Sequence, residues 1–145
     1  MKIDYAIKAI ETKNFDINYD NYDRNIEGST FDLQTNYFAD DELFIVKLSH
    51  TLIIFQAENA PIATLEVDYT FKILEEQWQE LYNEDGALII PQGLVMVFYN
   101  IAIGTTRGIL HAKLEKTPFS TYYIPPVVLQ DAVKSDLSFE FKNED

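Results

Sequence analysis

The chain has 145 residues, of which 47% are hydrophobic and 14% aromatic, so it can bury a core of its own and is not disordered as a whole. Lys and Arg total 11 against 24 Asp and Glu, and the net charge of −13 would repel a polyanion, which excludes nucleic acid as a partner. Because the sequence has no Cys, it can form no disulfide, no thiolate metal site and no cysteine nucleophile.

The acidic residues are unevenly spread along the chain. Residues 1–43 carry 10 acids and 4 bases (net −6), residues 58–85 carry 8 acids and 1 base (net −7), and residues 86–114 contain no acid. No Gly/Ser-rich or Pro-rich linker separates these stretches, so we predict a single domain over residues 1–145. The first residues, MKIDYAIK, interrupt their apolar positions with charge and lack the apolar run of a secretory signal, which predicts a cytoplasmic protein.

Four segments before residue 75 alternate apolar and polar side chains, the pattern of half-buried β-strands. They are residues 15–20, 30–37, 44–54 and 63–73. Turn-forming residues at 58–61 place the last two segments in a hairpin. Short connections and one polar face per strand predict a four-stranded antiparallel sheet over about residues 3–74.

Two helices are predicted after the strands: a short helical insertion over about residues 75–86 and a long helix over about residues 91–114, where Pro91 suits a helix start. With the sheet they make an α+β domain. The long helix has two apolar faces, more than one sheet can cover, so its second face is expected to contact another copy of the chain. Asn100 and Arg107 interrupt the apolar residues and argue against a membrane span.

Two glycines in the long helix, Gly104 and Gly108, lie one turn apart. Each costs a helix interior about 1 kcal/mol relative to Ala, which suggests close approach by a partner helix or, alternatively, fraying near the helix end. The predicted oligomer interface comprises Val95, Tyr99, Ala102, Gly104 and Gly108.

An aromatic and proline-rich loop is predicted at residues 115–126. Its prolines limit the entropy lost on ordering, and its aromatic side chains offer apolar area to a bound polypeptide or, alternatively, to the sheet beneath. The candidate groove residues are Phe119, Tyr122, Tyr123, Ile124, Pro125 and Pro126. The tail at residues 127–145 is expected to form a short strand or a weakly ordered end.

The sequence offers no constellation for catalysis. His50 lies on the apolar side of a predicted strand and His111 late in the long helix, and neither has the spacing of a metal site. The acid pairs at 40–41 and 75–76 fit solvated turns or first helical turns, and the five glycines form no nucleotide-binding motif. We therefore predict a binding protein that is not an enzyme and that needs no cofactor and no metal.

Several short motifs, in their order and spacing, resemble the protein-export chaperone SecB and its SecB-like relatives over roughly residues 5–133. They are Ile7–Lys13 followed by Phe15, Leu65-Glu66-Val67, Thr105-Thr106-Arg107-Gly108, Thr117-Pro118-Phe119 and Tyr123-Ile124-Pro125-Pro126-Val127. The resemblance implies an α+β domain with a Greek-key-like sheet and a homotetramer, a dimer of dimers, with the long helices at the interfaces. It also implies ATP-independent binding of unfolded polypeptides in apolar grooves between sheet, helix and loop, for protein export.

The resemblance further implies a surface for the motor ATPase of the Sec translocase. An acidic strand face would attract the motor's small basic zinc-binding tail, although a solubility role would account for the acids equally well. This acidic face is formed by Asp16, Asp20, Glu66 and Asp68. Where relatives that serve export carry acids on the first strand, this sequence has Asn14 and Asn18. The alternatives are a SecB-like chaperone of a toxin–antitoxin system and a non-enzymatic oligomeric ligand-binding domain.

Overall fold

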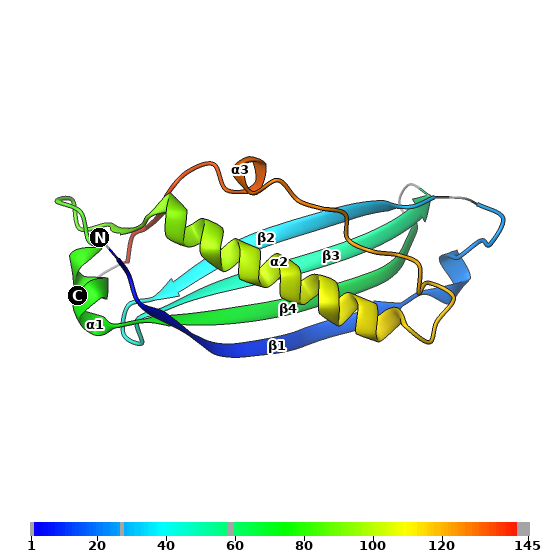
Figure 1. Ribbon diagram of the computed structural model, residues 1–145, viewed down its shortest axis with the longest axis horizontal. Helices are drawn as coiled ribbons and strands as arrows, with labels where there is room; N and C mark the ends of the chain where they lie inside the picture. Colours follow the sequence, from blue (N-terminus) through cyan, green and yellow to red (C-terminus); the bar gives the residue numbers. More distant parts are fainter. Residues whose placement is uncertain (1, 27, 58–59, 142–145) are drawn as a thin grey trace.

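The computed structural model describes residues 2–26, 28–57 and 60–141, and it has an α+β fold in which one long helix lies across one face of an antiparallel sheet (Figure 1). The predicted fold class is confirmed. The elements, in chain order, are β1 (Tyr5–Ile17), η1 (Tyr19–Asn21), β2 (Thr30–Asp40), β3 (Ile45–Ala57), β4 (Ala60–Ile73), α1 (Glu75–Glu80), β5 (Leu88–Ile90), α2 (Gln92–Leu114), α3 (Leu129–Ala132) and β6 (Leu137–Phe139). Residues 58–59 of the predicted turn and residues 142–145 of the predicted tail lie outside the described residues.

The four long strands pair in the order β1-β4-β3-β2, and every pair is antiparallel. Strands β2, β3 and β4 follow one another as hairpins and β1 lies beside β4, which is a Greek-key order. Alternate residues of the two central strands are buried beneath α2, as their alternation predicts. They are Val46, Leu48, His50, Leu52, Ile54, Ala63, Leu65, Val67, Tyr69, Phe71 and Ile73. The polar residues between them point to the opposite face of the sheet, which we call the open face.

Strand β1 is longer than predicted, because the alternation at residues 15–20 marks only its end. Its pairing with β4 shifts register twice, and the extra residues are Lys8 and Lys13. Each such β-bulge reverses which face the following side chains point to. No single period therefore covers the strand, which is why alternation alone did not reveal its first ten residues.

Helix α2 begins immediately after Pro91 and ends at Leu114, as predicted. Its first free amide, that of Gln92, donates a hydrogen bond to Asp136 Oδ1 at 2.7 Å, so the tail caps the helix. The helix crosses the sheet obliquely (Figure 1), and the Phe98 ring stacks on Phe71 of β4 with the centroids 4.1 Å apart.

The two apolar stripes of α2 form one broad buried face. Val95, Tyr99 and Ala102, expected from the sequence at an oligomer interface, are at most 5% exposed and pack in the core of the same chain. The prediction is wrong for these three residues, because neighbouring rows of a helix can contact one sheet together. By length and mean hydropathy α2 could cross a membrane, yet this face lies within the chain's own core.

Short elements complete the fold around the start of α2. Strand β5 was not predicted and pairs antiparallel with β6 of the tail. The tail therefore forms a short strand, which was one of its two expected states. Between α2 and β6 the chain is irregular apart from the four-residue helix α3.

A polar cluster lies inside the core between β3, β4 and α2. The His50 side chain is fully buried, with Nδ1 3.2 Å from the Thr106 hydroxyl, which also hydrogen-bonds the Tyr69 hydroxyl. Its Nε2 has no hydrogen-bond partner among the described residues. Burial lowers the pKa of His50 to about 4, because a charged imidazolium would lose its hydration there.

We predict that His50 makes the fold acid-sensitive. Its pKa is about 4 in the folded chain and about 6.5 in the unfolded chain, so below pH 6.5 the unfolded state binds a proton that the folded state does not. The contribution of His50 to the free energy of unfolding is therefore complete above pH 6.5. It falls by about 3 kcal/mol as the pH drops toward 4. Urea unfolding of the wild type and of His50→Gln at pH 7 and pH 4 measures the difference, with the exposed His111→Gln as control. An equal loss in wild type and His50→Gln would contradict the prediction.

Candidate functional site

The loop predicted to line a groove is partly core. We call residues 118–128 the crossing segment, since they follow α2 and pass across the sheet on the α2 side (Figure 1). Phe119 is fully buried, with its ring edge-on to Tyr22 at 4.7 Å between centroids, and Ile124 is 4% exposed. The prediction that these two residues form an exposed groove is wrong, because each fills space between the segment and the core.

Side-chain donors hold the crossing segment in place. Arg107 of α2 donates from Nε to the carbonyl of Ile124 at 3.0 Å and from Nη2 to the carbonyl of Pro125 at 3.1 Å. Gln56 of β3 donates from Nε2 to the Tyr122 hydroxyl at 3.4 Å. Proline has no amide hydrogen and cannot donate to the hydrogen-bond ladder of a sheet. The side-chain hydrogen bonds to this segment therefore hold it in place instead of a ladder.

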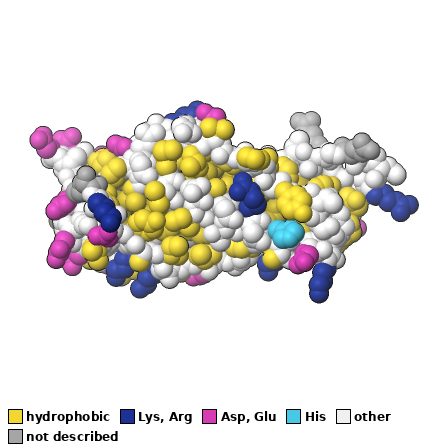
Figure 2. Space-filling model, viewed as in Figure 1, with side chains coloured by type: hydrophobic (Ala, Val, Ile, Leu, Met, Phe, Trp, Pro, Cys, Tyr) yellow, Lys and Arg dark blue, Asp and Glu magenta, His cyan; other side chains and the backbone are white. Residues whose placement is uncertain are grey.

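Of the remaining predicted groove residues, Tyr122 is half-buried against the core and the other three are exposed. Tyr123 is 55% exposed, Pro125 and Pro126 are exposed, and Val128 adds a further exposed apolar side chain at 57%. The Tyr123 ring stacks on His111 of α2, with the centroids 5.6 Å apart. Figure 2 shows apolar side chains along α2 and the irregular chain beside it. We call Tyr123, Pro125, Pro126 and Val128 the segment surface.

A second apolar area lies on the other side of α2, where β1 emerges from beneath the helix. Tyr5, Ile7 and Ile10 are 39%, 49% and 43% exposed, and Val97 of α2 is 39% exposed. An open pocket of about 310 Å³ lies at this place, lined by Ile3, Tyr5, Pro91, Gly93, Leu94 and Val97. We call Tyr5, Ile7, Ile10 and Val97 the β1 flank. Sequence analysis missed it, although Tyr5 and Ile7 do alternate with polar or small residues.

The two interface glycines lie on the outer side of α2. Gly104 and Gly108 are exposed, and a Cβ added at either position would meet no atom within 4 Å. They share this side of the helix with Val97, since residues 97, 104 and 108 are spaced by seven and four positions. Nothing within the described chain thus requires glycine at these two positions.

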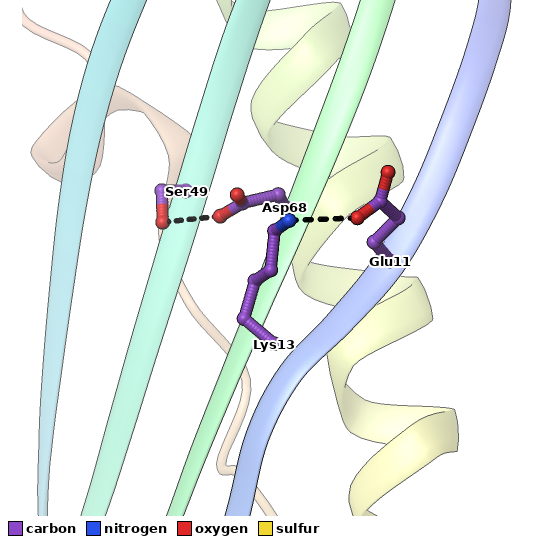
Figure 3. Close-up of polar contacts among 4 residues, drawn as sticks. All are labelled: Glu11, Lys13, Ser49 and Asp68. Atoms are coloured by element: carbon purple, nitrogen blue, oxygen red, sulfur yellow. Dashed lines mark hydrogen bonds and ion pairs between the residues drawn. The ribbon is translucent and has the colours of Figure 1, made fainter.

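Three of the four acids predicted to form an acidic face lie on the open face, and Glu11 lies there in addition. Asp16, Glu66 and Asp68 lie there, and Asp68 accepts a hydrogen bond from the Ser49 hydroxyl at 2.7 Å (Figure 3). Glu11 is opposite Asp68 on β1 and pairs with Lys13 Nζ at 2.8 Å, a hydrogen bond that lowers the pKa of Glu11. We call these four acids the open-face acids.

Asp20 is not on this face, so that part of the prediction is wrong. The chain leaves the sheet after Ile17, because Asn18 caps η1 and accepts a hydrogen bond from the Asp20 amide at 3.2 Å. The structure also places the two asparagines that stand where the SecB pattern has acids. Asn18 is the N-cap of η1, and Asn14 lies directly opposite Glu66 on the open face.

No three His, Cys, Asp or Glu side chains among residues 2–26, 28–57 and 60–141 are placed to hold a metal ion. His50 is buried together with the Thr106 hydroxyl that it contacts, and His111 stacks on the Tyr123 ring. The exposed areas of the described chain defined above are the segment surface, the β1 flank and the open-face acids.

No protein-family model and no curated protein sequence matches this chain. Among solved structures, a SecB-like chaperone of Mycobacterium tuberculosis, in complex with a ChAD peptide from the HigA1 antitoxin, is similar to it. The two chains are 17% identical, the match covers 85% of this chain and 90% of that chain, and the TM-score is 0.44. At this identity and TM-score the similarity carries no functional argument, and the proposals below depend on the geometry of this chain.

Proposed function

We propose that this protein is an ATP-independent holdase that binds non-native polypeptides. The observation that carries the proposal is the apolar surface left exposed beside a single covering helix. Tyr123 and Val128 on one side, and Tyr5, Ile7 and Ile10 on the other, are each at least 39% exposed. Scattered apolar residues are common on surfaces, but groups of them mark places where another chain binds.

The charge of the protein suits this role. A net charge of −13 keeps a chain with exposed apolar groups in solution and favours positively charged or neutral clients. Aromatic rings such as Tyr123 contact many sequences without requiring a particular hydrogen bond. The segment surface is therefore proposed as the client-binding area, with Phe119 and Ile124 supporting it from the core.

Aggregation of a chemically unfolded protein, diluted into buffer without ATP, tests the holdase function. Equimolar wild-type chain is expected to suppress light scattering. The double variant Tyr123→Ser, Val128→Ser should need about tenfold more chain, because roughly 1.4 kcal/mol of apolar contact is lost. Leu43→Ser removes an apolar side chain that is 57% exposed in the β2–β3 turn and is the matched control. The proposal fails if the wild type leaves scattering unchanged.

We also propose that the chain self-associates through the β1 flank and the glycine side of α2, with a homotetramer as the assembled form. No described segment covers the β1 flank as the crossing segment covers the other side. Gly104 and Gly108 would let a partner backbone approach α2 closely. Val95, Tyr99 and Ala102 have no part in this interface, because they are buried inside the chain.

Gly108→Leu is expected to reduce the sedimentation coefficient by breaking the assembly. The folded chain has room for the new side chain, since no atom lies within 4 Å of a Cβ added at this position. Replacing a helical glycine also favours the helix by up to about 1 kcal/mol. Gln79→Leu adds the same exposed side chain on α1 and serves as control. An unchanged mass at an unchanged circular dichroism spectrum would rule out this interface.

The finer proposal is delivery of clients for export, in the cytoplasm, through the open-face acids and a basic partner such as the zinc-binding tail of the Sec motor. Binding of that tail should be salt-sensitive, because exposed ion pairs are screened over about 8 Å at physiological ionic strength. The triple variant Asp16→Asn, Glu66→Gln, Asp68→Asn should weaken binding about tenfold at low salt. Its matched control is Glu75→Gln, Glu76→Gln, Glu80→Gln, which removes three charges from α1. If the two variants bind the tail with equal affinity, the open-face acids are not its binding surface, and the clients are delivered to another partner.

A further inference from the structure

The sheet has two edge strands, β1 and β2, and they differ in how they are protected. An edge strand leaves the main-chain N–H and C=O groups of every second residue without a partner strand. Such an edge can accept another extended chain, and natural proteins block it with bulges, lysines or prolines.

Strand β1 carries two of these protections. Its two β-bulges fall at Lys8 and Lys13, so each break in the ladder coincides with a charged side chain. A bulge twists the strand and removes the regular spacing that a partner strand needs. The edge at β1 is therefore poorly suited to accept a strand.

Strand β2 carries none of them. Its eleven residues, TFDLQTNYFAD, pair with β3 from Thr30 to Asp40 without a register shift, and they include no Lys, Pro or Gly. Among the main-chain hydrogen bonds of the described residues outside the ladders and helices, none reaches β2. In Figure 1 the chain that leads to α3 crosses β2 and then runs alongside its outer edge, but no described main-chain hydrogen bond outside the ladders joins it to β2.

The side chains of β2 indicate what such a partner strand would contain. Phe31, Leu33 and Tyr37 point to the α2 side and are only half-buried, so they can pack against apolar residues of an added strand. On the open face Asp32, Gln34 and Asn36 are exposed. A Lys or Arg beside Asp32 would form a favourable cross-strand pair, whereas an acid there would be repelled.

We propose that an extended segment of a non-native polypeptide, alternating apolar with basic or uncharged polar residues, adds to β2 as a fifth strand. This inference deepens the proposed holdase function and rests on it. Main-chain hydrogen bonds give affinity for any sequence in an extended state, and alternate side-chain contacts give a preference among sequences. Each segment bound in this way is also withheld from pairing with another unfolded chain.

Hydrogen exchange on the full chain locates the bound strand. A decapeptide in which valine and lysine alternate is the probe, and its binding should slow exchange of alternate amides between residues 30 and 40. If the peptide binds and protects amides of β1 or the crossing segment instead, the β2 proposal is overturned while the holdase function stands. If the β2 amides are already protected in the free protein and become exposed on dilution, a second copy occupies the edge, which also overturns it. The β2 proposal is also overturned if the protein suppresses aggregation but bound peptide slows exchange at no amide of β2.

Two proline substitutions provide an independent test. Of Asp32→Pro and Leu33→Pro, one removes an amide that faces away from β3 and is tolerated at an edge, and the other removes a ladder bond and destabilises the sheet. The variant whose urea midpoint stays near that of the wild type should bind the decapeptide about tenfold more weakly. Unchanged affinity in that variant overturns the proposal. A decapeptide that is N-methylated on alternate residues, in either phase, is the matched control, because only one phase should lose binding.

Discussion

A single helix is about 10 Å wide, whereas four strands at about 4.8 Å spacing span about 14–19 Å, so α2 covers only part of the sheet face beneath it. The rest of the structure depends on this mismatch. The buried rows of β3 and β4 lie under the helix and are almost without exposure. On the same face, the side chains of both edge strands stay partly in solvent: Tyr5, Ile7 and Ile10 on β1, and Phe31 and Leu33 on β2.

The two uncovered sides are treated differently by the rest of the chain. Beside β2 and β3 the crossing segment supplies a cover, anchored by the buried Phe119 and Ile124 and by Arg107, which donates to two successive carbonyls. A cover fixed at a few points, and free of ladder hydrogen bonds, leaves the side chains between its anchors in solvent. Tyr123 is one of these, stacked on His111 and more than half exposed. Beside β1 no described segment takes this role, and the exposed residues there adjoin the exposed side of α2.

What the sequence predicted correctly depends on local patterns. Pro91 and the apolar run after it locate α2 to within a residue at its start, and the alternation in 44–54 and 63–73 locates most of the two central strands. Errors arose where a distant contact or a bulge decides the outcome. Val95 and Phe119 are buried by segments far along the chain, and the bulges at Lys8 and Lys13 concealed most of β1. Apolar character alone does not tell a client-binding side chain from a core side chain, so the segment surface needed the three-dimensional structure.

The distribution of charge separates the two faces of the sheet. The α2 side draws on residues 86–114, which contain no acid, whereas the open face gathers Asp16, Glu66 and Asp68 with Glu11, partly offset there by Lys47 and Lys72. Such crowding is mildly unfavourable, and the local contacts relieve it: Lys13 pairs with Glu11, Ser49 donates to Asp68, and Asn14 stands opposite Glu66 in place of another carboxylate. A polypeptide bound on the α2 side would therefore leave the acidic face in water. In the proposed holdase, that face would repel its counterpart on other molecules and would so oppose aggregation of the loaded complex.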